Sequence, residues 1–155
     1  MKRPRLFEVV LAALLLSLVT LIVSHQAKSG IEAPLIDNAE IRFEFVDVWV
    51  DSATQKLAAY QFELALENGT AEIVGLEGGG HRAFAEPPYY DPAALHGKRI
   101  IVAAFNTGVD LPKGKTRVAR LHMQITGIDK PHYVVKLMES CGPSGEKIPA
   151  TAGVN

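Results

Sequence analysis

The chain has 155 residues, of which 48% are hydrophobic and 21% charged, so it has room for one globular domain and a short appendage. Its formal net charge is −1, which excludes the strongly basic balance of many nucleic-acid-binding proteins, and no nucleic-acid partner is expected. Cys141 is the only cysteine, which excludes an intramolecular disulfide.

A basic cluster and a long apolar run open the chain. Residues 1–5 carry three positive charges, and a helix over Leu6–Ser24 would be about 28 Å long, close to the roughly 30 Å of a bilayer's hydrocarbon core. This predicts a single-pass membrane anchor with residues 1–5 in the cytoplasm and the domain outside, in the periplasm or at the cell surface. The alternative is a signal peptide cleaved before Gly30, which would leave a secreted protein. Residues 25–38 are expected to form a short tether between the membrane and the domain.

The first predicted strand is Glu40–Asp51, in which apolar residues occupy every second position. They fall on odd positions up to Phe45 and on even positions from Val46 onward. A slip of one residue between Phe45 and Val46 predicts a β-bulge or a strand that crosses between sheets. Trp49 then shares a face with two aspartates, which makes it a candidate stacking platform for a ligand.

The clearest strand is Leu57–Glu67, which alternates strictly between apolar and mostly polar residues. Its period of two predicts that one face packs on a core. The residues expected on that inner face are Tyr60, Phe62, Leu64 and Leu66. A third strand is expected over Ala71–Glu77, ended by the three glycines at 78–80.

An irregular segment, His81–Lys98, follows the third strand. Its three prolines exclude a central strand. Tyr89 and Tyr90 lie in its stiff middle and are the main candidate binding residues, because tyrosine offers a large contact area and a hydroxyl. The alternative is that one or both cover the open end of the fold.

The rest of the chain predicts further short strands separated by turns. They are expected over Arg99–Asn106, Thr116–Thr126 and His132–Glu139, with a last edge strand at Glu146–Ala150 and a loose tail at 151–155. About seven strands without a convincing helix predict an all-β fold, an antiparallel two-sheet β-sandwich over residues 39–150.

Four strands resemble those of one known family. Ala58–Leu64, AAYQFEL, is similar to the Ala-Ala-Tyr-x-Phe-x-Leu strand of cohesin domains and of the related carbohydrate-binding modules. Ile73–Glu77, Ile100–Phe105 and Val118–Ile125 resemble later strands of the same domains, so the resemblance covers roughly residues 41–139. It implies a jelly-roll sandwich that recognises either another protein or a carbohydrate. The proline- and tyrosine-containing segment replaces the family's connection between its third and fourth strands.

Chemical motifs are sparse in the chain. His81 and His96 bracket the irregular segment, yet no histidine stands at metal-ligand spacing, so neither metal nor cofactor is expected. The glycines at 78–80 lack the lysine of a phosphate-binding loop. Cys141 precedes a Gly-Pro turn and is expected to be inert. No nucleophile elbow or paired-acid motif is present, so the protein is not expected to be an enzyme.

These patterns favour a membrane-anchored recognition domain outside the cytoplasm. It would bind an envelope or secreted protein through a sheet face or through the loop that carries Tyr89 and Tyr90. Carbohydrate binding on exposed aromatic residues such as Trp49 is one alternative. A structural subunit of an envelope assembly, paired with its neighbour through a sheet edge, is another.

Overall fold

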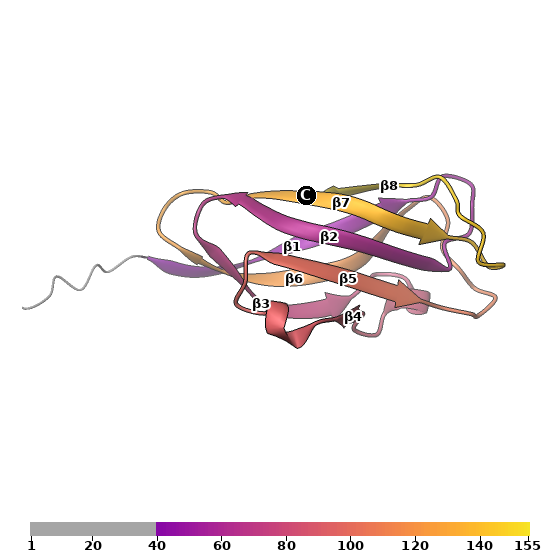
Figure 1. Ribbon diagram of the computed structural model, residues 1–155, viewed down its shortest axis with the longest axis horizontal. Coiled ribbons are helices and arrows are strands. Elements are labelled where there is room, and N and C mark those ends of the chain that lie inside the picture. Colours follow the sequence, from indigo (N-terminus) through magenta and orange to yellow (C-terminus); the bar gives the residue numbers. More distant parts are fainter. Residues whose placement is uncertain (1–39) are drawn as a thin grey trace, which may run out of the picture. The chain divides into compact units, whose positions relative to one another are not determined.

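Eight strands form two antiparallel four-stranded sheets in the part of the chain that the computed structural model describes, residues 40–155 (Figure 1). Sheet A has the order β3-β6-β1-β8 and sheet B the order β4-β5-β2-β7. The strands are β1 (Ile41–Asp51), β2 (Ala59–Asn68), β3 (Ala71–Gly78), β4 (Tyr89–Tyr90), β5 (Arg99–Phe105), β6 (Lys115–Thr126), β7 (His132–Cys141) and β8 (Thr151–Val154). The predicted all-β, two-sheet antiparallel architecture is confirmed.

The predicted anchor over residues 6–24 and the tether over residues 25–38 lie outside the described residues. Within residues 40–155, no helix is long and apolar enough to span a membrane.

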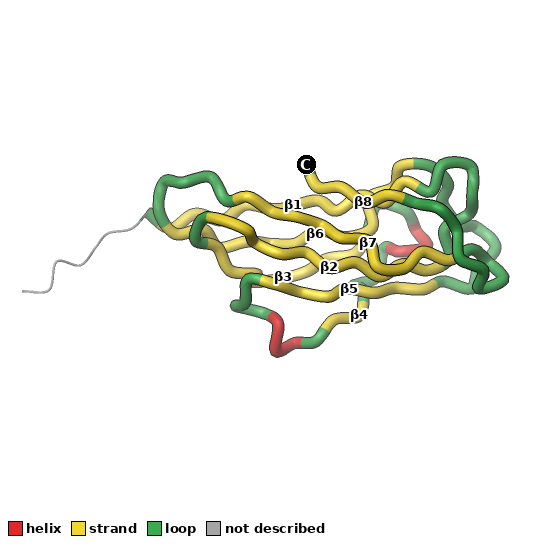
Figure 2. The backbone as a smooth tube through the Cα atoms, turned by 45° about the horizontal axis from the view of Figure 1, so that its top comes forward, coloured by secondary structure: helices red, strands yellow, loops and turns green. Residues whose placement is uncertain are grey.

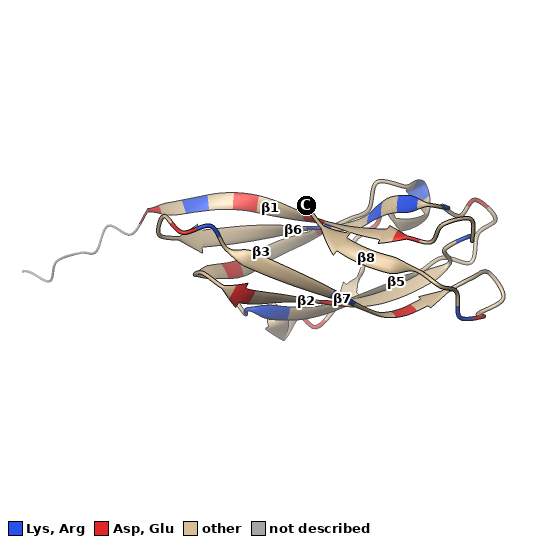
Figure 3. Cartoon of the chain, turned by 90° about the horizontal axis from the view of Figure 1, so that it is seen from above, with Lys and Arg blue, Asp and Glu red and all other residues tan. Residues whose placement is uncertain are grey.

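The core lies between the two sheets, which are seen edge-on as two layers in Figure 3. The inner face of β2 supplies Tyr60, Phe62 and Leu64, all buried as predicted, and Leu66 packs at the margin. The valines of β1 face them from sheet A, together with the inward residues of β6, which are Ala119, Leu121, Met123 and Ile125. Tyr60 also donates a hydrogen bond from its hydroxyl to the Val118 carbonyl, 2.8 Å away, which joins sheet B to sheet A. Burial raises the pKa of Tyr60 well above its usual range.

Strand β1 differs from its prediction. The expected slip between Phe45 and Val46 is wrong, because the alternation runs on unbroken there and the irregularity against β6 lies between Val48 and Trp49. Val46, Val48 and Val50 point into the core, so the odd-numbered residues point out. A slip at this point would turn both apolar rows toward the core. Instead the first row stays outside, with Ile41, Phe43 and Phe45 exposed by 59%, 68% and 54%.

The C-terminal residues also differ from their prediction. Thr151–Val154 is not a loose tail but strand β8, which pairs antiparallel with β1 from Val48 to Asp51. The expected edge strand at residues 146–150 is reduced to one isolated bridge between Lys147 and Cys141, and Ser140 exchanges two further hydrogen bonds with the Ile148 backbone. The last strand lies at 151–154 because β1 has backbone N–H and C=O groups that β6 does not reach. Thr151–Val154 forms the hydrogen bonds that these groups need.

The irregular segment returns along the edge of sheet B. Figure 2 shows two short helical turns, Arg82–Phe84 and Pro92–Ala94, on either side of β4. Strand β4 is only two residues long and pairs with Ala103 and Val102 of β5 at the sheet edge, in agreement with the exclusion of a central strand. Gly78 allows this path, because a Cβ atom there would lie 2.1 Å from the carbonyl oxygen of Ala85.

Candidate functional site

A shallow groove of about 220 Å³ crosses the outer face of sheet B and is the candidate site. We call it the sheet B groove. Strands β2, β4, β5 and β7 build it from Ala59, Tyr60, Gln61, Tyr89, Ala103, Ala104, Phe105, Glu139 and Cys141. Because these residues come from four hydrogen-bonded strands, the backbone under the groove is rigid.

The floor of the groove is apolar because small residues meet at neighbouring outward positions. Ala59 of β2 lies opposite Phe105 of β5, and Gln61 lies opposite Ala103. Alanines beside larger side chains leave a hollow on an otherwise pleated surface. A partner's apolar side chain would fit this space without displacing any protein group.

Two aromatic rings form one wall of the groove. Tyr89 and Phe105 lie nearly parallel, with an interplanar angle of 10° and ring centroids 6.0 Å apart. Their side chains are exposed by 69% and 64%. The two rings together form an exposed aromatic patch on this wall.

Tyr90 has a different place from Tyr89, although both were candidate binding residues. Consecutive residues of a strand point to opposite faces. Tyr90 is therefore half-buried and packs against the core, while Tyr89 projects into solvent. Of the two, only Tyr89 lines the groove.

The opposite wall is more polar. Glu139 forms an ion pair with Lys147 at 3.1 Å, and the Gln61 amide lies 3.8 Å from the sulfur of Met138. Cys141 is half-buried at this wall. The groove thus offers few free hydrogen-bonding groups for a polar ligand.

Trp49 lies on the other sheet and does not join the tyrosines. It faces outward on sheet A opposite Gly153, and the ammonium of Lys115 lies 5.3 Å from its ring centroid. Its ring is half-buried and borders a separate hollow of about 270 Å³. A cation already occupies one face of this ring.

The histidines that bracket the irregular segment have separate partners. His81 accepts a hydrogen bond from the Ala83 backbone and lies 3.8 Å from Asp110, whereas His96 lies 3.6 Å from Glu72. Within residues 40–155, no group of three or more histidine, cysteine or acidic side chains is placed to hold a metal ion.

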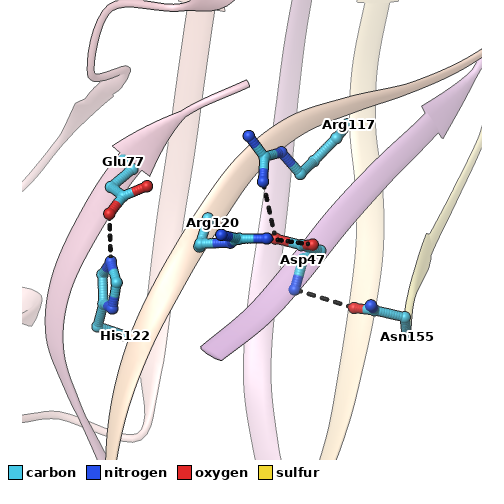
Figure 4. A network of polar contacts seen from close by, with 6 residues as sticks. All are labelled: Asp47, Glu77, Arg117, Arg120, His122 and Asn155. Carbon is cyan, nitrogen blue, oxygen red and sulfur yellow. Dashed lines mark hydrogen bonds and ion pairs between the residues drawn. The ribbon is translucent and has the colours of Figure 1, made fainter. Parts of the chain in front are cut away.

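A polar network lies on the outer face of sheet A (Figure 4). Arg120 donates two hydrogen bonds to the Asp47 carboxylate, at 2.7 and 2.9 Å, and Arg117 lies 3.5 Å from the same group. The Asp47 backbone N–H donates to the side chain of Asn155 at 3.0 Å. These contacts tie β1 to β6 and to the residue after β8, which is a structural role. Next to them, His122 pairs with Glu77 at 2.7 Å.

Asp47 makes folding stability depend on pH. The hydrogen bond from Arg120 lowers the pKa of the Asp47 carboxyl below its usual 3.8, and the charges of Arg120 and Arg117 add to this, while burial opposes it. A depressed pKa in the folded state contributes stability above the unfolded pKa, and this contribution is lost as the pH falls through the folded pKa. We therefore expect the melting-temperature advantage of the native chain over Asp47→Asn to shrink below about pH 4.

Thermal unfolding at a series of pH values would test this, with Asp129→Asn as the control because its carboxylate is exposed. A difference between the native chain and Asp47→Asn that stays constant down to low pH would contradict the assignment.

Phe105 is the groove residue that sequence reasoning missed. The run Arg99–Asn106 is almost entirely apolar, which predicts a deeply buried strand, and Ile100 and Val102 are indeed buried. The outward positions of β5 nevertheless lie on an open sheet face. Only the pairing of β4 with β5 brings Tyr89 beside Phe105, and no local sequence pattern encodes that pairing.

Comparison of the chain with family models, with curated proteins and with solved structures found no match. The resemblance to cohesin domains therefore stays a prediction from the strand motifs.

Proposed function

We propose that this protein is an extracytoplasmic recognition module, held at the membrane by residues 6–24, that binds an envelope or secreted protein through the sheet B groove. The observation that carries the proposal is the exposed Tyr89–Phe105 pair beside a floor of alanines. Aromatic anchors next to a small apolar hollow are the features that dominate protein–protein binding energy.

The chemistry of the groove favours a protein over a carbohydrate. A sugar ring stacked on Tyr89 would still need several donors and acceptors for its hydroxyl groups. Besides the Tyr89 hydroxyl, the groove offers mainly the side chains of Gln61 and Glu139, and Glu139 is already paired with Lys147. An aliphatic or aromatic side chain of a partner protein fits the alanine floor better.

Site-specific photocross-linking in cells that carry the full chain would test the proposal. A photoreactive phenylalanine analogue at position 89 is expected to capture a discrete protein partner. The same analogue at position 109 is the matched control, because Val109 is exposed by 89% and lies outside the groove. Equal capture from both positions would contradict a specific site.

The captured partner then permits a quantitative test. Tyr89→Ala and Phe105→Ala are each expected to weaken its affinity at least about tenfold, as expected for aromatic anchors. Trp49→Ala, on the other sheet, is expected to leave the affinity unchanged. Displacement of the partner by soluble polysaccharide would instead indicate that the groove binds carbohydrate.

A further inference from the structure

Strand β1 has an edge that the described residues leave unpaired. Strand β8 covers β1 only from Val48 to Asp51, and β1 continues past the end of β8 in Figures 1 and 3. The Asp47 N–H points to this edge and is taken by the Asn155 side chain. Because the backbone groups of alternate residues point to the same side of a strand, those of Phe43 and Phe45 also face this edge. Within residues 40–155 they have no strand partner there.

The same stretch carries an apolar row on its outer face. Ile41, Phe43 and Phe45 follow one another at a period of two, and each is more than half exposed. An unpaired edge with exposed apolar side chains is a template for pairing with another strand. Natural edge strands usually block such pairing with a proline, a bulge or an inward-pointing charge. Residues 41–46 contain neither proline nor bulge, and the two charges on their inner face, Arg42 and Glu44, are opposite in sign and so can pair with those of a second copy.

We infer that a second copy of this chain pairs with this edge, β1 to β1, antiparallel and centred on Phe43. The sequence of the stretch, Ile-Arg-Phe-Glu-Phe, complements itself in that register. Phe43 lies opposite Phe43 of the second copy and Ile41 lies opposite its Phe45. On the other face, Arg42 lies opposite Glu44 of the second copy, and the two-fold axis repeats this contact.

Charge selects this register over its neighbours. A shift of the centre to Arg42 places two arginines opposite each other, and a shift to Glu44 places two glutamates there. Like charges directly opposite each other destabilise an antiparallel pair, whereas opposite charges stabilise it. Within one copy, Arg42 donates to the Glu44 carboxylate at 2.8 Å and to the backbone carbonyls of Gly127 and Asp129, so the contact across the two-fold axis shares groups that are already paired inside each chain.

The length of the pairing is also set by the fold. Asn155 occupies the edge at Asp47, so a second strand fits only along the stretch before it. The result is an isologous two-fold dimer in which the two copies of sheet A form one continuous sheet. This inference does not rest on the proposed function, because the groove lies on sheet B.

A charge-swap experiment on the full chain, purified in a mild detergent, tests the pairing. Sedimentation of the native chain is expected to show a dimer. Glu44→Arg places two pairs of arginines in contact, and Arg42→Glu places two pairs of glutamates in contact, so each variant alone is expected to be monomeric. An equimolar mixture restores both opposite-charge contacts and is expected to form a heterodimer. Recovery in the mixture also shows that both variants are folded. A monomeric native chain, or variants that dimerise as well as it does, would overturn the inference.

Engineered cysteines test the register in a Cys141→Ser background. Opposed residues in an antiparallel pair have Cα atoms about 5.5 Å apart, within the range for a disulfide. Phe43→Cys is therefore expected to form a disulfide-linked dimer under mild oxidation. Phe45→Cys is the matched control, because its two copies would lie four residues apart along the strands, about 13 Å, and should not cross-link. Cross-linking of both variants to the same extent, or of neither, would overturn the register.

Discussion

Replacement of Phe62 by alanine is expected to lower the free energy of unfolding by about 3–5 kcal/mol. Phe62 is fully buried and stacks on Tyr60 with ring centroids 5.9 Å apart. Its removal forfeits the burial of a phenyl ring and leaves a cavity between two sheets whose hydrogen-bonded backbones cannot collapse to fill it. Tyr60 would also lose a neighbour that helps to hold its hydroxyl against the Val118 carbonyl of the opposite sheet. Urea denaturation followed by tryptophan fluorescence measures the loss, since Trp49 lies on the sheet that faces this residue.

Phe105→Ala is the matched control for this measurement. It removes the same phenyl ring from the outer face of sheet B, where the ring is already 64% exposed. The expected change is within about 0.5 kcal/mol, as for most surface substitutions. Equal losses for the two variants would mean that the inner and outer faces of sheet B are wrongly assigned.

Gly78→Ala is expected to cost about 2–3 kcal/mol, although it adds a single methyl group. A Cβ atom at this position would lie 2.1 Å from the Ala85 carbonyl oxygen and 2.6 Å from that of Glu86. Both contacts are with backbone, so no side-chain rotation can relieve them. The segment that leads to β4 must move away from the end of β3, and Tyr89 must move with it. The variant should therefore also weaken binding at the sheet B groove.

Gly75→Ala, on the same strand, separates the steric clash at Gly78 from the general effect of replacing a strand glycine by alanine. Its Cβ atom would meet only the His122 side chain, at an ordinary contact distance of 3.7 Å. We expect little or no loss of stability, because alanine in a strand interior restricts the unfolded chain more than glycine does. Comparable denaturation midpoints for both variants would show that the close approach at Gly78 does not constrain the fold.

Local periodicity was sufficient to predict most of the fold. The alternation of Leu57–Glu67 identified a strand and its buried face correctly, because one side of β2 lies on the core and the other in solvent. The same rule failed for β1. It equates apolar with buried, and Phe43 and Phe45 are apolar and exposed. A residue's burial depends on what packs over it, and that information lies in distant strands.

The candidate site was predictable only in part for the same reason. Tyr89 could be singled out because it follows two prolines in a segment that cannot form a central strand. Its partner Phe105 could not, because their contact depends on the pairing of β4 with β5. The network around Asp47 likewise depends on the register between β1 and β6, which places Arg120 directly opposite Asp47. Contacts across strands are set by register, and no short window of sequence contains it.

The pairing of β1 with β6 and β8, within one chain, has a consequence for how the chain folds. Strand β1 is the first of the eight described strands to be synthesised, yet its partners β6 and β8 are among the last. Non-local pairing of this kind has a high contact order and slows folding, because a long loop must close before any contact forms. The core-facing valines of β1 therefore stay exposed to solvent until the C-terminal strands have formed. Unpaired strand edges and apolar side chains that are exposed during folding are prone to aggregation, and β1 has both until its partners are made.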